Sequence, residues 1–303
     1  MKKVKFLIVF VLIGSLIWYL FIKPYDYTVT FNAKTSPGTL FSNVEEWNLL
    51  NQKLDSFTYN INDKKAFTFI KETLKINDKS LDITWGFKSI NDSTTHVTVG
   101  VTEKEKSIYN RLTIPFLNTP FEEIVINTIK DYKKGIEYQL KNKTKVKLVG
   151  IDSIPEITYA YIEFKNIEMR KKAEQMMKYN ARLLQFINLN NLKGGNHPFL
   201  IIDKWDLNKS IIDFRFCFPV KQNDSMPTHD YIKFDVLKPT KALKAIYNGN
   251  YITSDRGWFA LHEYAKRHNI NIDNNPLEIF YNNPFYGGNE LKWRAEIYMP
   301  IKK

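Results

Sequence analysis

The sequence predicts an α+β protein in which one N-terminal transmembrane helix is followed by two folded domains. Three observations predict this class: a continuous apolar run near the N-terminus, a series of short β-rich segments separated by Asn-Asp turns, and a strand–helix–strand–strand order that occurs twice in the second half. With 44% hydrophobic and 15% aromatic residues, the long remainder of the chain can bury two cores. We therefore predict a membrane anchor over residues 1–25 and domains over residues 26–145 and 146–303.

The N-terminal segment has the pattern of a membrane-spanning helix. Three lysines precede the apolar run Phe6–Ile22, whose outer end carries Trp18 and Tyr19 before Lys23 closes it. A span needs roughly 20 apolar residues, and aromatic rings favour the headgroup region. The alternative is a cleaved signal peptide, which would need a shorter apolar stretch and small residues where this chain has bulky ones. The lysine excess before the run predicts a single-pass protein with a cytoplasmic N-terminus and a periplasmic or other extracytoplasmic body.

The formal net charge of +12 does not by itself predict a nucleic-acid partner. Proteins that bind nucleic acids gather basic residues on one face or in a groove, whereas the lysines here are spread along the whole chain. We therefore expect no nucleic-acid partner and a general attraction to anionic membrane surfaces. Cys217 is the single cysteine, which excludes an intrachain disulfide and predicts a small core residue.

The segment 26–145 is predicted to form a strand, a short helix, an antiparallel meander and a long helix, in that order. Ser36 and Pro37 suit the cap and the first position of the short helix, and Thr119-Pro120 opens the long one. Asn-Asp pairs are typical of tight turns between antiparallel strands. The predicted turns are Asn62-Asp63, Asn77-Asp78 and Asn91-Asp92, and the predicted strands are Tyr27–Ala33, Ser56–Ile61, Ala66–Ile76, Leu81–Ile90 and Thr95–Lys104.

Three segments in this part carry a family resemblance: the opening strand YTVTFNA, the helix SPGTLFSNVEEWNLLN with its Trp47, and the long closing helix. Together they resemble the helix-grip fold of the START-like, polyketide-cyclase-like (SRPBCC) superfamily, in architecture rather than in a short motif. The resemblance implies a curved sheet wrapped around the long helix, often enclosing an apolar cavity. Two interpretations follow, a ligand pocket or plain core, for Trp85, Phe87, Ile124 and Thr128.

The second half follows a charged connector, Asn142–Val149, and contains an internal repeat. Each copy has the order βαββ and ends in a Pro followed by an aliphatic residue, in Phe218-Pro219-Val220 and in Met299-Pro300-Ile301. The first copy is predicted at Tyr159–Phe164, Glu168–Ile187, Phe199–Trp205 and Ile211–Val220, and the second at Asp235–Tyr247, Asp255–Arg267, Leu277–Tyr281 and Lys292–Ile301.

The second copy carries the motifs of a known family. An aromatic-x-Gly-x-Tyr turn occurs at Tyr247–Tyr251, and Trp258 lies in the helix that follows. A Pro-x-Glu-x-x-Tyr strand occurs at Pro276–Tyr281, and Trp293–Ile301 places a Glu before its final Pro-aliphatic pair. These features resemble the GyrI-like small-molecule-binding domain, which is also the effector-binding domain of some bacterial activators.

Two acids in these strands are candidate ligand-binding residues. Alternation along the last strand places Glu296 on one face with Arg294 and Tyr298, and Glu278 lies beside an aromatic ring in the preceding strand. A carboxylate among aromatic rings can bind an organic cation, although an ion pair with Arg294 or Lys292 is the alternative for Glu296. Trp258 and Tyr281 also suit a plain core. Supported by the resemblance, the predicted ligand-binding residues are Glu296, Glu278, Tyr281, Trp258 and Tyr251.

No pattern in the sequence identifies catalytic residues, a metal site or a cofactor. His262 and His268 are not spaced as a metal-binding pair on one helical face, and His229-Asp230 suits a solvated turn. A nucleophile elbow, a P-loop and a Cys-His constellation are absent from the sequence. Some GyrI-like proteins hydrolyse electrophilic small molecules, so a hydrolase that uses Glu296 with Tyr281 stays an alternative.

The main prediction is a membrane-anchored protein that binds or senses an aromatic or cationic small molecule. In the bacterial activators the GyrI-like domain follows a DNA-binding helix-turn-helix, whereas a transmembrane helix and a START-like part precede it here. Direct control of transcription is therefore not expected. Besides the hydrolase, the remaining alternative is a lipid or apolar-ligand binder that acts through the START-like part. The sequence identifies neither the ligand nor a protein partner.

Overall fold

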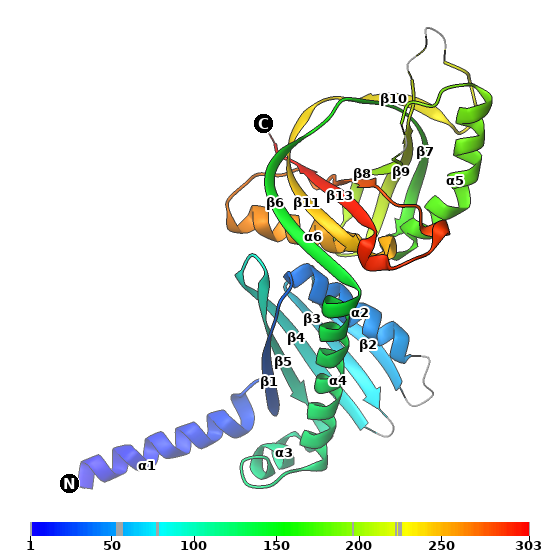
Figure 1. Cartoon of the computed structure of the whole chain (residues 1–303). Helices are drawn as coiled ribbons and strands as arrows, with labels where there is room; N and C mark the ends of the chain where they lie inside the picture. Colours follow the sequence, from blue (N-terminus) through cyan, green and yellow to red (C-terminus); the bar gives the residue numbers. More distant parts are fainter. Residues whose placement is uncertain are drawn as a thin grey trace. The chain divides into compact units, whose positions relative to one another are not determined.

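The computed structural model describes residues 2–52, 57–76, 79–195, 197–221, 223 and 226–302. The chain divides into two compact units, Met1–Glu137 and Tyr138–Lys303, which are described separately below. The sequence predicts the division a few residues later, after residue 145. Both units combine helices with an antiparallel sheet, so the predicted α+β class is confirmed (Figure 1).

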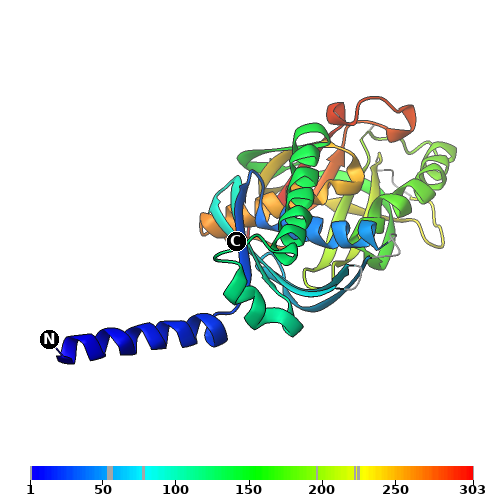
Figure 2. The same cartoon turned by 90° about the horizontal axis from the view of Figure 1, so that it is seen from below.

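The chain begins with an apolar helix. Helix α1 (Lys2–Ile17) continues into the π-helical turn η1 (Trp18–Ile22). The stretch Lys3–Ile22 has a mean hydropathy of 2.4 and is long enough to cross a membrane, a length and composition that a signal sequence shares. Its side chains are not buried against the rest of the protein (Figures 1 and 2). The predicted N-terminal apolar helix is therefore present.

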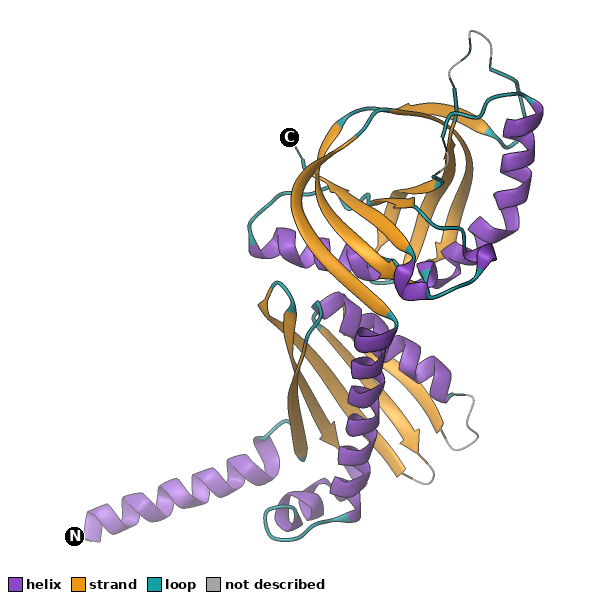
Figure 3. Ribbon diagram, in the orientation of Figure 1, coloured by secondary structure: helices purple, strands orange, loops and turns teal. Residues whose placement is uncertain are grey.

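The first unit is a five-stranded antiparallel sheet with two helices on one face (Figure 3). Its strand order is β1-β5-β4-β3-β2. Helices α2 and α4 bury their apolar stripes against the sheet, and the ring of Tyr132 in α4 lies 4.6 Å from that of Trp85. The elements are β1 (Tyr27–Ala33), α2 (Pro37–Asn51), β2 (Phe57–Lys65), β3 (Phe69–Ile76), β4 (Lys79–Asn91), β5 (Thr94–Thr102), η2 (Lys104–Lys106), α3 (Ser107–Thr113) and α4 (Pro120–Asn142).

The order of these elements follows the sequence prediction, with two differences. Asn62-Asp63 is not a turn, because β2 continues through it with a bulge after Ile61. The chain turns instead at Phe67, whose φ of 59° is unusual for a bulky residue and whose ring packs edge-on against Phe41. The second difference is the unpredicted helix α3. The turn predicted at Asn77-Asp78 lies outside the described residues.

The residues predicted to line a pocket in this unit have two kinds of environment. Trp85 and Phe87 point into the core from β4 and are buried. Ile124 and Thr128 lie on α4 and are half-buried. The Trp85 indole donates to the carboxylate of Glu72, at 2.6 Å, and packs against Tyr132. These contacts are those of a packed core around a buried polar group.

The second unit is an eight-stranded antiparallel sheet with α5 and α6 on its outer side (Figure 3). The strand order is β10-β7-β9-β8-β12-β13-β11-β6. Rings of β7 and β9 on the outer side contact α5, and Gly257 in α6 packs against Ile297 of β13. The elements are β6 (Thr144–Ile154), β7 (Ile157–Glu168), α5 (Lys172–Leu189), β8 (Phe199–Asp206), β9 (Ile211–Pro219), β10 (Lys233–Leu237), β11 (Thr240–Gly249), α6 (Asp255–Arg267), β12 (Leu277–Phe280) and β13 (Arg294–Pro300), with short 3-10 turns η3 (Met169–Lys171), η4 (Tyr251–Thr253), η5 (Pro284–Tyr286) and η6 (Glu290–Lys292).

Two sequence predictions for this unit are wrong in detail. The connector Asn142–Val149 enters β6, which pairs along β11 from Thr144 onward. The predicted strand Asp235–Tyr247 is two strands, since β10 pairs with β7 and β11 pairs with β6 and β13. Pro239 separates them because proline has no N–H to donate to a ladder. Each half is therefore ββαββ rather than βαββ.

The register of the sheet has an internal two-fold symmetry. At its centre, Leu277 pairs with Ile201 and Ile279 pairs with Phe199. Leu277 and Phe199 are equivalent positions in the two halves, as are Ile279 and Ile201. Exchanging the halves therefore converts one pair into the other. The outermost strands are exchanged as well, because β6 pairs with β11 of the second half and β10 pairs with β7 of the first. One consequence is that Arg215 in β9 occupies the position that Glu296 occupies in β13.

A candidate ligand-binding face on the second sheet

The side of the eight-stranded sheet that faces away from α5 and α6 is called the inner face here. Its floor is a buried apolar cluster to which most strands contribute. Four partly buried side chains pack at the edge of this cluster: Ile157, Tyr161, Leu237 and Tyr281. The cluster itself consists of Ile154, Tyr159, Phe199, Ile201, Cys217, Ala242, Leu277, Ile279 and Tyr298.

Glu296 lies on the inner face and accepts hydrogen bonds at both carboxylate oxygens. Oε2 accepts from the hydroxyls of Tyr298, at 2.8 Å, and Tyr281, at 3.0 Å, and lies 3.3 Å from Lys244 Nζ. Oε1 accepts from Arg294 Nη2 at 2.5 Å. Burial alone would raise the pKa of Glu296, but the two tyrosine hydroxyls and the Lys244 charge outweigh it and lower the pKa. The carboxylate is therefore ionised at neutral pH and already neutralised by two cations.

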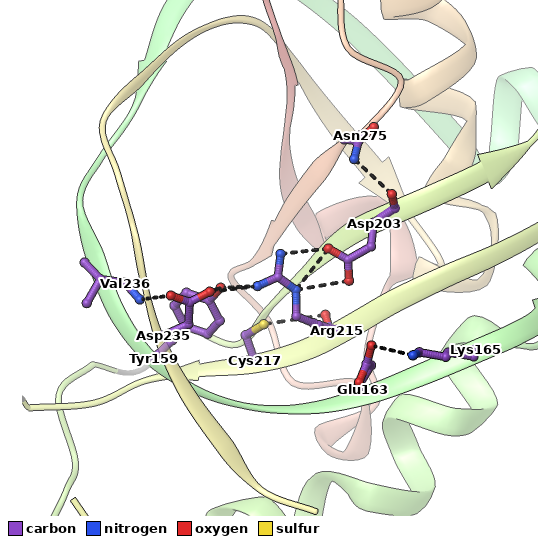
Figure 4. Close-up of polar contacts among 9 residues, drawn as sticks. All are labelled: Tyr159, Glu163, Lys165, Asp203, Arg215, Cys217, Asp235, Val236 and Asn275. Carbon is purple, nitrogen blue, oxygen red and sulfur yellow. Dashed lines mark hydrogen bonds and ion pairs between the residues drawn. The ribbon is translucent and has the colours of Figure 1, made fainter.

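The matching position in the first half holds a cation, Arg215 (Figure 4). Its guanidinium binds Asp203 through two parallel contacts, Nη2 to Oδ1 at 2.7 Å and Nε to Oδ2 at 3.0 Å. Its Nη1 donates to the Tyr159 hydroxyl at 2.5 Å and to Asp235 Oδ2 at 3.1 Å. The guanidinium also lies 5.3 Å from the centre of the Tyr161 ring. Bidentate geometry of this kind holds a guanidinium in one orientation.

The inner face thus has opposite charges at two equivalent positions, one on each side of an apolar floor. The two-fold symmetry of the sheet relates the strands that carry Glu296 and Arg215. Hydrogen-bond donors nevertheless surround Glu296, whereas acceptors surround Arg215. Lys244 of the second half binds Asp152 of the first at 2.9 Å, just as Arg215 of the first half binds Asp235 of the second. Such a surface is chemically suited to an organic molecule with an apolar body and a polar or charged end.

The five residues that the sequence predicts as ligand-binding do not lie on one face. Glu296 and Tyr281 meet on the inner face. Glu278 and Trp258 are fully buried on the helix-covered side, where Ser254 Oγ donates to Glu278 at 2.6 Å. Tyr251 lies at the end of the β12–β13 pair and donates its hydroxyl to the carbonyl of Arg294 at 2.8 Å. A ligand on the inner face would reach the first two residues and be separated from Glu278 and Trp258 by the sheet.

A buried lysine accompanies Glu278. Lys172, at the start of α5, is fully buried, with Nζ 5.1 Å from the Trp258 ring centre and 3.4 Å from the carbonyl oxygen of Tyr251. Burial raises the pKa of Glu278, and the positive charge of Lys172 opposes that rise. Because α5 belongs to the first half and β12 to the second, this electrostatic interaction links the two halves across the core.

Sequence reasoning missed Arg215 and its partners Asp203, Asp235 and Tyr159. The motifs of the second copy drew attention to Glu296, whereas the first copy has no recognisable motif around Arg215. The sequence did contain a signal for Arg215. When the two strands that end in Pro and an aliphatic residue are aligned at their prolines, Arg215 and Glu296 occupy the same position. Among the described residues, no cluster of three or more His, Cys, Asp or Glu side chains has the arrangement of a metal site.

Comparisons with known proteins give only distant similarities. No family model and no curated protein matches the chain. The C-terminal domain of EcmrR is similar over 53% of this chain and 98% of its own, with 16% identity and a TM-score of 0.43. EcmrR in a complex with DNA is similar over 64% of this chain and 70% of its own, with 18% identity and a TM-score of 0.43. SAV2435 bound to tetraphenylphosphonium is similar over 52% of this chain and 94% of its own, with 13% identity and a TM-score of 0.35.

TM-scores and identities of this size do not establish a common family. Both family resemblances noted in the sequence therefore stay predictions, as does the expected absence of a nucleic-acid partner. The side chains of the inner face have to support a functional assignment on their own.

Proposed function

We propose that this chain is a membrane-anchored protein whose second unit binds a small organic molecule on the inner face. The observation that carries the proposal is the pair of opposite charges, Glu296 and Arg215, at equivalent positions beside one apolar floor. The half-buried rings of Tyr161 and Tyr281 at the edge of the floor supply flat apolar surface. The cationic end of an aromatic ligand would pair with Glu296 and its aromatic body would pack on these rings, while Arg215 keeps its partners Asp203 and Asp235.

The ion pairs of Glu296 indicate how a cation would enter. Of the two cations on this carboxylate, the Arg294 side chain is 44% exposed and the Lys244 side chain only 15%. Lys244 is also held by Asp152, whereas the Arg294 guanidinium lies over the Tyr281 ring, 4.9 Å from its centre. A cationic ligand would take the place of the Arg294 guanidinium, gaining both the carboxylate and the aromatic ring. Such a cation–π contact contributes about 0.5 to 2 kcal/mol.

The proposal is tested with the full chain in lipid nanodiscs and tetraphenylphosphonium, an aromatic cation, as the probe. We expect Glu296→Gln to weaken binding roughly tenfold or more, a loss of about 1.4 kcal/mol. Glu163→Gln is the matched control, because Glu163 lies on the same face but pairs with Lys165 and Lys233. Arg294→Ala is expected to strengthen binding by freeing Oε1. Equal binding by the parent and Glu296→Gln, measured by equilibrium dialysis, would show the proposal to be wrong.

Retention of the N-terminal helix is the second part of the proposal, and contacts at its C-terminal end support it. Arg111 Nη1 donates to the carbonyl of Leu20 at 3.1 Å, and the Tyr19 hydroxyl donates to the carbonyl of Arg111 at 3.1 Å. Arg111 also pairs with the buried Asp26 at 2.8 Å. Cleavage of a signal sequence would remove the η1 partners of a buried arginine. Intact-mass measurement of the membrane fraction should find the uncleaved chain, and a soluble chain lacking residues 1–25 would contradict retention.

The alternatives receive less support from the geometry. A hydrolase would use Glu296 as a base, but its oxygens are occupied by four donors and its pKa is lowered. A lipid carrier would need open space near Trp85, which instead packs against Tyr132 and donates to Glu72. Binding on the inner face is the function that these side chains favour.

A further inference from the structure

Helix α3 has the opposite burial pattern from an ordinary surface helix, which buries its apolar side and exposes its polar side. It buries its polar residues Asn110 and Arg111 and exposes its apolar ones. The turn that follows continues the exposure, with Phe116 at 83%. We call these exposed side chains the α3 patch; they are Ile108, Tyr109, Leu112, Phe116 and Leu117. A contiguous apolar patch on a protein surface is characteristic of an interaction site.

The polar side of α3 is held inward by specific partners, so the patch cannot turn into the core. Arg111 Nε donates to Asp26 Oδ1 at 2.8 Å, and Ser107 Oγ donates to the same oxygen at 2.5 Å. Asn110 Nδ2 donates to Glu103 Oε2 at 2.9 Å. Removing these polar groups from their partners would leave buried charges unpaired. The fold therefore fixes the apolar side of α3 toward the surroundings.

The same arginine places the patch beside the end of the apolar N-terminal helix. Arg111 Nη1 reaches the carbonyls of Leu20 and Tyr19 in η1, at 3.1 and 3.4 Å. Both views show α3 next to the C-terminal end of this helix (Figures 1 and 2). Trp18 and Tyr19 occur at that end, where aromatic rings mark the bilayer interface. The exposed Lys104 and Lys106 precede α3 and suit lipid headgroups.

We propose that the α3 patch inserts into the interface of the same bilayer that the N-terminal helix spans. The inference rests on the membrane attachment proposed above and adds a second contact with lipid. Tyr109, Phe116 and their aliphatic neighbours lie in the headgroup and upper acyl region, as in interfacial amphipathic segments. Two contacts rather than one hold the first unit against the membrane surface and restrict rotation about the chain at Lys23.

The test places a probe on the patch in the full chain. Phe116→Cys is labelled with bimane and reconstituted in phosphatidylcholine vesicles with or without lipid that carries a nitroxide on its acyl chain. Native Cys217 is buried, so the unmodified chain serves as the labelling blank. Leu12→Cys within α1 reports the anchor. Ile90→Cys is the matched control, because Ile90 is also an exposed apolar residue. It lies near the end of β4, at the opposite end of the sheet from the start of β1, where the N-terminal helix joins the sheet.

We expect the nitroxide lipid to reduce emission from the probes at Phe116 and Leu12 and to leave the Ile90 probe unchanged. A Phe116 probe that keeps its emission while the Leu12 probe is quenched would overturn the inference and leave the anchor standing. If neither probe is quenched, the membrane attachment itself is wrong. A Phe116 probe that is protected from aqueous iodide but not quenched by the lipid would mean that protein covers the patch, which also overturns the inference.

Discussion

The buried carboxylate of Glu72 and that of Glu296 show how local partners decide the charge of an acid. Glu72 in β3 accepts from Trp85 Nε1 at 2.6 Å and from Asn48, yet burial dominates and raises its pKa to about 7. Glu296 has two cations and two hydroxyls around it, and its pKa is lowered. At neutral pH, Glu72 therefore titrates while Glu296 stays ionised.

The raised pKa of Glu72 predicts that acid stabilises the first unit. Since the folded-state pKa, about 7, exceeds the ordinary value of 4.5, the stabilisation is complete below 4.5 and is lost as pH rises through 7. The difference corresponds to about 3 kcal/mol. Protonated Glu72 can also donate to Asn48 Oδ1, which is buried without a partner, once that amide is turned.

Chemical unfolding of the parent and of Glu72→Gln across this pH range checks the prediction. The variant should lose the pH dependence and exceed the parent in stability above pH 7. Glu137→Gln, a change at an exposed residue in α4, should keep the parent's pH profile. A Glu72→Gln profile that still falls between pH 4.5 and 7 would show that another group titrates.

The buried Lys172 in the second unit predicts a strongly non-additive pair. Lys172→Met removes the cation that opposes the pKa rise of Glu278 and is expected to cost about 3 kcal/mol. Adding Glu278→Gln removes the acid that has lost its cation but keeps an acceptor for Ser254 Oγ, so most of the loss should be recovered. A double-mutant cycle of unfolding free energies measures the coupling. Additive effects would mean that the two charges do not interact.

At the scale of elements, Arg111 joins α3, η1 and the start of β1. Arg111→Ala is expected to destabilise the first unit by about 3 to 5 kcal/mol, because Asp26 stays buried without its guanidinium partner. Arg170→Ala is the matched control, since Arg170 pairs with Glu168 at 2.7 Å in an exposed setting and should matter little. Thermal unfolding compares the two. Equal losses would contradict a structural role for Arg111 at the helix end.

The elements that sequence reasoning predicted well are those with one dominant local signal. The helices α2, α4 and α6 have clear starts and apolar stripes, and they form where expected. Errors arose where long-range pairing overrides local signals. Asn62-Asp63 favours a turn, but β3 continues to pair alongside it, and the charged connector becomes β6 because β11 offers a free edge. Helix α3 was missed because its apolar residues face outward.

The candidate site was predictable only in part for the same reason. Alternation in β13 places Glu296 with Arg294 and Tyr298, and their hydrogen bonds confirm that grouping. Lys244 and Arg215 come from strands whose register the sequence does not reveal. Aligning the strand ends matches Arg215 with Glu296, but the partners of Arg215 and Lys244 depend on pairing between β11, β13, β9 and β8, which only the folded sheet provides.

At the scale of the whole molecule, the two sides of the second sheet differ in how deeply their charged groups are buried. The helix-covered side of the second sheet holds the fully buried pair Lys172 and Glu278, whereas the inner face keeps charged groups that are partly exposed. Exchange of β6 and β10 between the halves ties the two copies into one sheet. Each side of the inner face therefore carries strands from both halves.

The charge bias of the N-terminal segment predicts which side of the membrane carries the inner face. Lysines before the apolar run Phe6–Ile22 outnumber those directly after it, so the second unit should lie outside the cytoplasm. Tyr286 is 88% exposed, and a membrane-impermeant maleimide should label Tyr286→Cys on intact cells while leaving Val4→Cys unlabelled. Buried Cys217 contributes no background. The reverse pattern would place the inner face in the cytoplasm. The excess of lysines before the apolar run is small, so replacing Lys3 and Lys5 with Ser should produce both orientations. Both Tyr286→Cys and Val4→Cys should then be labelled. That result would identify the lysines as the cause of the orientation.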